Sequence, residues 1–236
     1  MSGLRIAFDV DGVLADFAAT YHDIEVRLFG PESIDGLSYR HDEPASVAAA
    51  DLSMPRDVST QRDVKRRQRS RAAVWQVITT TQDFWAGVKP IARDAVRRLH
   101  RLSVEHHWEV FFITQRPPTR GDTVQRQTQR WLYDQGFEMP SVIVLNGSRH
   151  AFAATLCLDY YVDDNTTNCV DVTAGSPARS ILIVDYTNST VLANARRLGI
   201  ATAHNIIAAL DILEDTTAAR PGQHMLNQIA RLVRWT

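Results

Sequence analysis

The sequence predicts an α/β protein in which helices cover both faces of a parallel β-sheet. Three observations lead to this prediction: short, largely apolar runs recur along the chain, turn residues follow each run, and helical patterns lie between the runs. A strand that is buried on both faces has no polar side, so it reads as a continuous apolar run. Alternation of such strands with helices is typical of a parallel sheet.

The first expected strand covers residues 4–8 and ends at an acidic turn that contains Gly12. Apolar runs predict four more strands, at residues 110–114, 141–145, 160–163 and 180–185. Helical spacing of apolar residues predicts three helices, whose buried faces would be formed by Ala92, Ala95, Val96, Leu99 and Leu102, by Val124, Thr128, Trp131 and Leu132, and by Val191, Leu192, Ala195 and Leu198. Ligands of such sheets bind at the carboxyl ends of the strands.

Residues 17–87 interrupt this alternation, because they are polar and are helical where they show a pattern, notably around residues 61–80. We therefore expect a small helical cap inserted after the first strand, with residues 1–16 and 88–215 forming the core domain. A length of 236 residues suits one core with one insertion. Residues 216–236 are expected to form a C-terminal amphipathic helix that packs on the core, with Met225, Leu226, Ile229 and Val233 at helical spacing.

The composition excludes several classes of protein. The formal net charge is −1, so no overall field draws the chain to nucleic acid or to an anionic membrane. No apolar run approaches the ~18 residues of a membrane-spanning helix, and we expect no membrane partner. Cys157 and Cys169 form no CxxC pair, which argues against a disulfide scaffold or a structural zinc site. The first ten residues lack the features of a signal peptide, so a reduced, cytoplasmic compartment is expected.

The strongest chemical signal lies at the end of the first expected strand, where Asp9 and Asp11 stand two residues apart. Because the chain turns there, both carboxylates can converge on one point with a metal ion between them; a plain Asx turn is the alternative. The stretch DVDGVLADF resembles the first motif of the haloacid dehalogenase superfamily, and most of all that of the 5′(3′)-deoxyribonucleotidase-like phosphatases. The resemblance implies a Rossmann-like core with a cap and Mg²⁺-dependent phosphomonoester hydrolysis. It covers residues 4–16 and 88–210.

Two further motifs of the superfamily have candidates at strand ends. Thr114 begins Thr-Gln-Arg-Pro, which is similar to the family's Thr-x-Arg-Pro loop, and its hydroxyl would hold a phosphoryl oxygen. Val162-Asp163-Asp164-Asn165 resembles the acidic fourth motif, in which adjacent carboxylates complete a magnesium site. An Asx turn is the alternative for this second stretch.

The third motif is where the sequence departs from the family pattern. The family commonly uses a lysine there, but this chain has only Lys65 and Lys89. Arg149 is the best candidate to replace it, and His150 is the rival. A guanidinium binds a phosphoryl group through two N–H groups, so its geometry differs from that of an ammonium. A surface arginine without a role is the remaining alternative.

The resemblance implies a role for each candidate. Asp9 would attack phosphorus to form an aspartyl-phosphate, and Asp11 would first protonate the leaving oxygen and then activate water. Thr114 and Arg149 would hold the phosphoryl oxygens. Mg²⁺ would be bound by Asp9, Asp163, Asp164 and Asp11, the last through its backbone carbonyl in the family pattern.

Substrate choice is expected to come from the cap, because the core motifs contact only the phosphoryl group and the metal. Phe17 matches the aromatic residue that follows the first motif in deoxyribonucleotidases and helps to form the base pocket there; packing of the first cap helix is an equal alternative. Gln115 and Arg116 are further candidate substrate-binding residues. Trp75, Phe84 and Trp85 could stack on a base, although aromatics at such a junction also serve plain packing.

The expected substrate is a small phosphomonoester, in particular a nucleoside monophosphate. Alternatives are another small phosphomonoester and a phosphate at a nucleic-acid end. The basic run within residues 62–71 could contact a polynucleotide backbone or could be a solvated helix face. A non-catalytic binding protein with the same fold is the alternative of another class; the intact Asp9 and Asp11 count against it, and the missing lysine counts for it.

Overall fold

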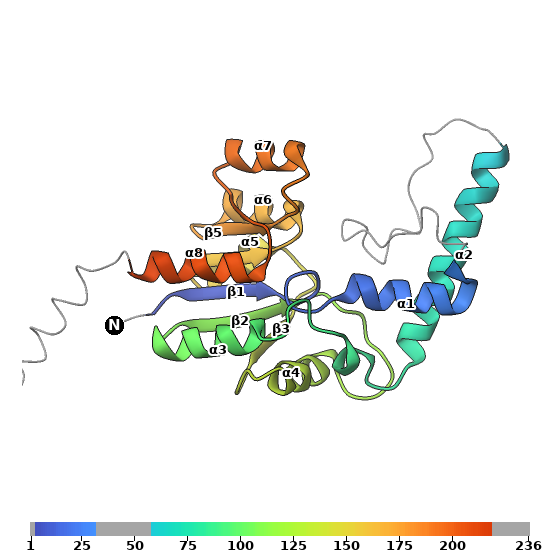
Figure 1. The fold of residues 1–236 in the computed structure, drawn as a ribbon, viewed down its shortest axis with the longest axis horizontal. Coiled ribbons are helices and arrows are strands. Elements are labelled where there is room, and N and C mark those ends of the chain that lie inside the picture. Colours follow the sequence, from blue (N-terminus) through green and yellow to red (C-terminus); the bar gives the residue numbers. More distant parts are fainter. Residues whose placement is uncertain (1–2, 32–57, 219–236) are drawn as a thin grey trace, which may run out of the picture.

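A six-stranded parallel sheet forms the centre of the protein in a computed structural model, which describes residues 3–31 and 58–218 (Figure 1). The strand order is β3-β2-β1-β4-β5-β6, and every pair of neighbouring strands is parallel. The strands are β1 (Arg5–Asp9), β2 (Glu109–Thr114), β3 (Ser141–Val144), β4 (Tyr160–Asp163), β5 (Arg179–Ile183) and β6 (Ala201–Ala203). The predicted α/β fold is confirmed, and all five expected strands are present.

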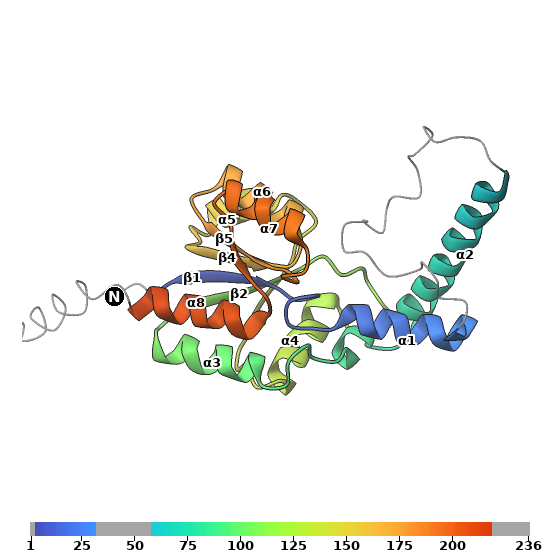
Figure 2. The same ribbon diagram turned by 45° about the horizontal axis from the view of Figure 1, so that its top comes forward.

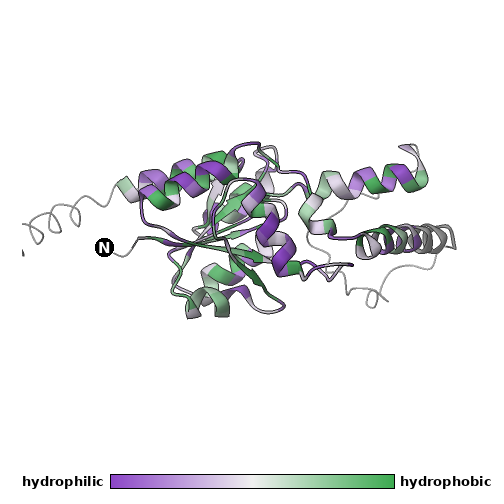
Figure 3. Ribbon diagram, turned by 90° about the horizontal axis from the view of Figure 1, so that it is seen from below, coloured by the Kyte–Doolittle hydropathy of each residue, from purple (hydrophilic) through white to green (hydrophobic). Residues whose placement is uncertain are grey.

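Helices cover both faces of the sheet (Figure 2). Helices α3 (Ala95–Glu105), α4 (Val124–Asp134) and α8 (Ile206–Ala218) pack on one face, and α5 (Arg149–Thr155), α6 (Thr166–Gly175) and α7 (Ser189–Arg197) pack on the other. Along β1, Ile6 and Phe8 belong to the first of these cores, whereas Ala7 belongs to the second. Because both faces are covered, the strands are largely hydrophobic and the helices mix polar and apolar residues (Figure 3).

Two helices project beyond the carboxyl ends of the strands and pack against each other (Figure 1). Helix α1 (Phe17–Phe29) begins immediately after the β1 loop, where Asp16 Oδ1 accepts a hydrogen bond from the Ala19 N–H at 2.9 Å. Helix α2 (Val58–Thr80) follows, and a short 3-10 helix, η2 (Phe84–Gly87), leads back to the core. These elements occupy the region predicted as a cap, and the division into core and cap remains a prediction.

The structure does not describe one predicted helix, and it contains one strand that was not predicted. The expected C-terminal helix within residues 216–236 lies outside the described residues, apart from the last turn of α8. Strand β6 was not expected, because it is only three residues long and contains no large apolar side chain. Among the described helices, none combines the length and the apolar character that crossing a membrane would require.

Candidate active site

The carboxyl ends of β1, β2 and β4 meet where the strand order changes direction. The chain runs outward from β1 to β2 and β3, and then crosses back to β4 on the other side of β1. Phe8 pairs with Val162, so the next residues, Asp9 and Asp163, end neighbouring strands side by side. On the other side of β1, Asp9 pairs with Ile113, which precedes Thr114. Open parallel sheets bind ligands at such a switch point.

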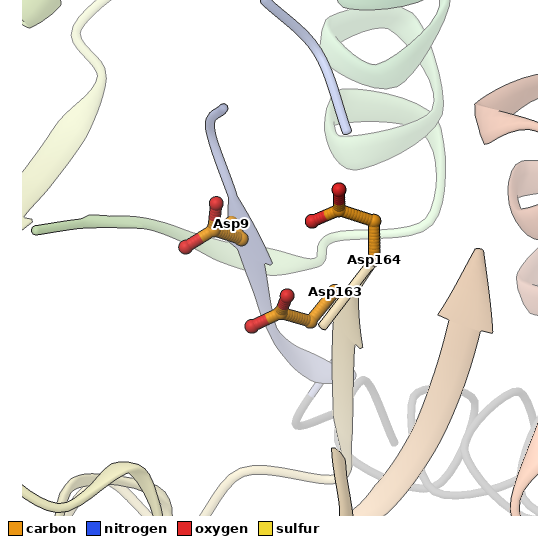
Figure 4. A group of neighbouring side chains, drawn as sticks. All are labelled: Asp9, Asp163 and Asp164. Carbon is orange, nitrogen blue, oxygen red and sulfur yellow. The ribbon is translucent and has the colours of Figure 1, made fainter. Parts of the chain in front are cut away.

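Three carboxylates lie together at this point (Figure 4). Asp9, Asp163 and Asp164 each place a carboxylate oxygen within 4.8 Å of the others, and the first two are buried. Burial, together with the charge of Asp163, raises the pKa of Asp9 well above its usual range and raises that of Asp164 to about 8. A cation at this point would relieve both effects. The set contains oxygen ligands only, which suits Mg²⁺ better than a metal that prefers nitrogen or sulfur.

Arg149 is the cation that the fold places beside these carboxylates. It is the first residue of α5, it is buried, and its Nη2 lies 3.5 Å from Asp9 Oδ1. Burial acts to lower the pKa of Arg149, but the neighbouring Tyr161, Asp9 and Asp163 outweigh burial and raise it, so the guanidinium stays charged. Its Nη1 is buried without a hydrogen-bond partner among the described residues. One N–H direction of the guanidinium is therefore available for a ligand.

Thr114 presents a second buried polar group of this kind. The residue ends β2 and is 1% exposed, and its Oγ1 has no hydrogen-bond partner in the described part of the chain. Buried hydroxyl groups are normally paired, since an unpaired one loses its bonds to water without replacement. A phosphoryl group at the end of β1 would supply oxygens to both Thr114 and Arg149.

His150, the rival of Arg149, is held away from the carboxylates by other partners. Its Nδ1 lies 2.8 Å from Asp171 Oδ1 and 2.7 Å from Ser148 Oγ, and its backbone N–H donates to Asp171 Oδ2 at 3.0 Å. The imidazole is half-exposed. These contacts tie the start of α5 to α6, so His150 anchors the helix that carries Arg149.

Asp11 lies outside the group of three carboxylates. Its carboxylate forms a two-point ion pair with Arg116, with Nε to Oδ2 at 2.8 Å and Nη2 to Oδ1 at 2.7 Å. The prediction that Asp11 binds Mg²⁺ concerned its backbone carbonyl, so the position of the side chain leaves it as a prediction. Arg116, expected to bind substrate, is paired with Asp11, and its neighbour Gln115 is exposed; substrate binding by these two residues stays a prediction.

Phe17 lies inside an aromatic cluster where α1, α2 and η2 meet. The side chain is 2% exposed, and its ring centroid lies 5.3 Å from that of Trp85 and 5.8 Å from that of Trp75. Tyr21 and Phe84 also belong to the cluster. Almost no surface of Phe17 is left for a base to stack on in this arrangement, which favours the packing alternative.

Three donors that the sequence reasoning did not single out fix the orientation of Asp163. The Tyr161 hydroxyl and Asn168 Nδ2 both donate to Oδ2, the latter at 2.9 Å, and the Asn165 N–H donates to Oδ1 at 2.7 Å. Tyr161 precedes Asp163 by two residues on β4, so both side chains point to the same face of the sheet. The position of a tyrosine two residues before Asp163 on the same strand is the sequence signal that could have revealed this role.

The comparisons with known proteins are informative at the level of structure alone. No protein-family model matches the chain, and no curated protein matches it either. Among solved structures, a phosphonoacetaldehyde hydrolase-like protein from Oleispira antarctica matches with a TM-score of 0.52 and 12% identity over 92% of this chain and 94% of that one. A hydrolase from Pseudomonas syringae matches with a TM-score of 0.51 and 13% identity over 90% and 98%.

A third match carries the superfamily's name. It is a hydrolase of the haloacid dehalogenase-like family from Streptococcus pneumoniae, with a TM-score of 0.48 and 12% identity over 89% of this chain and 97% of that one. The chain shares its fold with the hydrolases from Oleispira antarctica and Pseudomonas syringae. At these identities the matches establish a shared fold, and the chemistry has to be argued from the side chains described above.

Proposed function

We propose that this protein is a Mg²⁺-dependent phosphomonoester hydrolase that forms an aspartyl-phosphate on Asp9. One observation carries the proposal: three carboxylates lie within 4.8 Å of one another at the switch point of the sheet, beside a buried arginine. Three carboxylates beside one arginine leave negative charge that is costly to bury, and a divalent cation would balance it. The fold is shared with proteins described as hydrolases, which supports the same reaction class.

The residues of this chain divide the reaction between them. Asp9 attacks phosphorus as the alcohol oxygen leaves, and Asp11 gives that oxygen a proton; Asp11 then takes a proton from the water that releases phosphate from Asp9. Arg149 and Thr114 hold the phosphoryl oxygens throughout. Mg²⁺, held by Asp9, Asp163 and Asp164, would neutralise charge between the carboxylates and the phosphate.

A nucleoside monophosphate is the proposed substrate. Its support is the resemblance of DVDGVLADF and of Thr-Gln-Arg-Pro to the motifs of the 5′(3′)-deoxyribonucleotidases. The burial of Phe17 withdraws one argument for base recognition, so the phosphate-binding motifs carry this part of the proposal. A cytoplasmic location belongs to the same proposal, in agreement with two free cysteines.

A substrate panel tests the proposal. Hydrolysis of nucleoside monophosphates, sugar phosphates, p-nitrophenyl phosphate and oligonucleotides phosphorylated at either end is measured with Mg²⁺ and with excess chelator. We expect Mg²⁺-dependent turnover, with the highest kcat/KM on a nucleoside monophosphate. A higher value for sugar phosphates or oligonucleotides would move the substrate class to one of these. Mg²⁺ binding without any turnover would favour the non-catalytic binding protein.

A further inference from the structure

All three guanidinium nitrogens of Arg116 donate hydrogen bonds within the protein. Two of its nitrogens donate to the two oxygens of Asp11, and the third, Nη1, donates to Thr128 Oγ1 at 3.0 Å. The Arg116 side chain is 1% exposed and that of Asp11 is 14% exposed. A buried fork-to-carboxylate pair of this geometry fixes both partners in direction as well as in distance.

An aromatic ring packs against the guanidinium of Arg116. The guanidinium lies over the ring of Trp85, at 4.8 Å from the ring centroid. Trp85 is itself fixed, because its indole N–H donates to the Pro117 carbonyl at 2.9 Å and its backbone N–H donates to Gln127 Oε1 at 3.0 Å. Arg116 therefore joins the loop after β1 to the loop after β2, to α4 and to η2.

The fork formed by Nε and Nη2 of Arg116 is occupied by Asp11. A phosphoryl group that bound this fork would have to displace Asp11 from both nitrogens, whereas Arg149 already offers an unused N–H. We propose that Arg116 is a positioning residue: it holds the Asp11 carboxylate apart from Asp9, Asp163 and Asp164, where Asp11 can transfer protons and does not become a fourth carboxylate of that group. This inference rests on the proposed hydrolase function, in which Asp11 protonates the leaving oxygen.

The leaving group of the substrate separates this role from phosphate binding. A p-nitrophenolate leaves without protonation, whereas the alkoxide of a nucleoside needs the proton from Asp11. Because kcat/KM covers the steps up to departure of the leaving group, Arg116→Gln should lower it about 10²- to 10⁴-fold for a nucleoside monophosphate, the usual worth of a general acid. For p-nitrophenyl phosphate the decrease in kcat/KM should stay within about tenfold, well below the usual contribution of a general acid. Arg116→Lys should recover part of the lost activity, since it keeps the charge.

Two further measurements use the same protein. If Arg116 acts through Asp11, then Arg116→Gln should cause no further loss in an Asp11→Asn background. Calorimetric titration of the Mg²⁺-loaded enzyme with inorganic phosphate should give the same affinity in wild type and Arg116→Gln. Arg98→Gln is the control, because Arg98 likewise forms ion pairs with carboxylates, those of Asp211 and Glu214, but between α3 and α8. It should lower the melting temperature without any dependence on the leaving group.

Several results would overturn the inference. Equal losses for both leaving groups together with weaker phosphate binding would make Arg116 a phosphate ligand, as would an additional loss in the Asp11→Asn background. If Arg116→Gln does not fold, the same comparisons are made with Arg116→Lys, and equal losses for both leaving groups would again decide against it. A wild-type protein that hydrolyses neither substrate would overturn the proposed function first, and this inference with it.

Discussion

The residues of the site that cost most to bury are the charged ones. Asp9 and Asp163 are buried beside the partly buried Asp164, and Arg149 is the cation in contact with Asp9. Charges of one sign are costly to bury together, so their presence at the ends of β1 and β4 has to serve something other than stability. Each of these residues can therefore be changed with a predicted effect on chemistry that differs from its effect on folding.

Asp9→Asn should abolish turnover while leaving the fold intact. The amide is neither a useful nucleophile nor a charged metal ligand, and it removes one repulsive partner from a crowded group of carboxylates. Steady-state kinetics combined with thermal unfolding tests this, and we expect a melting temperature at or above that of the wild type in the absence of metal. Substantial phosphatase activity in a folded Asp9→Asn variant would contradict the aspartyl-phosphate mechanism.

Arg149→Ala should reduce kcat about 10²- to 10³-fold, as the removal of one preorganised donor to the transferring group typically does. Arg149→Lys should restore part of this activity because charge is kept while the two-point grip is lost. His150→Ala is the control: its contacts with Asp171 and Ser148 anchor α5, so its effect on kcat should be mild. The reverse ranking of the two alanine variants would assign the phosphate-binding role to His150.

At the scale of single elements, strand β4 carries both a metal-site carboxylate and the group that orients it. Tyr161→Phe removes only the hydroxyl that donates to Asp163 and keeps the buried ring. Loss of such an orienting hydrogen bond should weaken Mg²⁺ binding about 10- to 100-fold, measured by titration calorimetry. Tyr160→Phe is the matched control, since Tyr160 belongs to the core on the opposite face of the sheet. Equal Mg²⁺ affinity in both variants would show that Tyr161 only fills space.

Helix α1 is attached to the rest of the protein through aromatic packing. Phe17→Ala removes a ring that contacts Tyr21, Trp75, Phe84 and Trp85. The free energy of unfolding should therefore fall by about 3–5 kcal/mol. Chemical denaturation measures this change. In kinetic assays the variant should affect nucleoside monophosphates and p-nitrophenyl phosphate equally. A selective rise in KM for the nucleotides would instead restore the base-binding role that the sequence motif suggested for Phe17.

How far the sequence predicts an element depends on what the element packs against. Strands β1, β2, β4 and β5 are largely buried and read as apolar runs, as does the partly buried edge strand β3, whereas β6, with the sequence Ala-Thr-Ala, carries no such signal. Helix α5 is only seven residues long, and α8 is apolar over most of its first half, so neither shows the alternation of an exposed amphipathic helix. Their positions become visible only once the sheet is assembled.

The candidate site, too, could be predicted from the sequence only in part. The grouping of Asp9 with Asp163 and Asp164 follows from the rule that carboxyl ends of parallel strands share one edge, so sequence reasoning could find it. The pairing of Arg116 with Asp11 joins residues 105 positions apart and depends on the side-chain directions in two loops. The burial of Phe17 likewise depends on where α2 and η2 come to lie. Such contacts are set by tertiary packing, about which local sequence says little.

For the whole molecule, the three carboxylates make folding sensitive to both pH and metal. The pKa of Asp164 is raised from 3.8 to about 8, by burial first and by Asp163 second, and that of Asp9 is raised in the same direction. A carboxyl group whose pKa is higher in the folded state favours folding only while it is protonated. Its contribution is complete below about pH 4, its unfolded pKa, and is lost as the pH rises towards 8.

Mg²⁺ should reverse this loss, because it binds the ionised carboxylates and releases their protons. The increase in melting temperature on adding Mg²⁺ should thus be small near pH 5 and should grow towards pH 8. Thermal unfolding with Mg²⁺ and with chelator across this range measures it. Asp164→Asn is the control. Without metal, the free energy of unfolding of this variant should fall less with rising pH than that of the wild type. The difference should reach up to about 5 kcal/mol at pH 8, since one pKa unit corresponds to about 1.4 kcal/mol. The increase in melting temperature with Mg²⁺ could instead be equal at pH 5 and pH 8 in both wild type and variant. Protons and metal would then not compete for the same oxygens, and these carboxylates would not form the metal site.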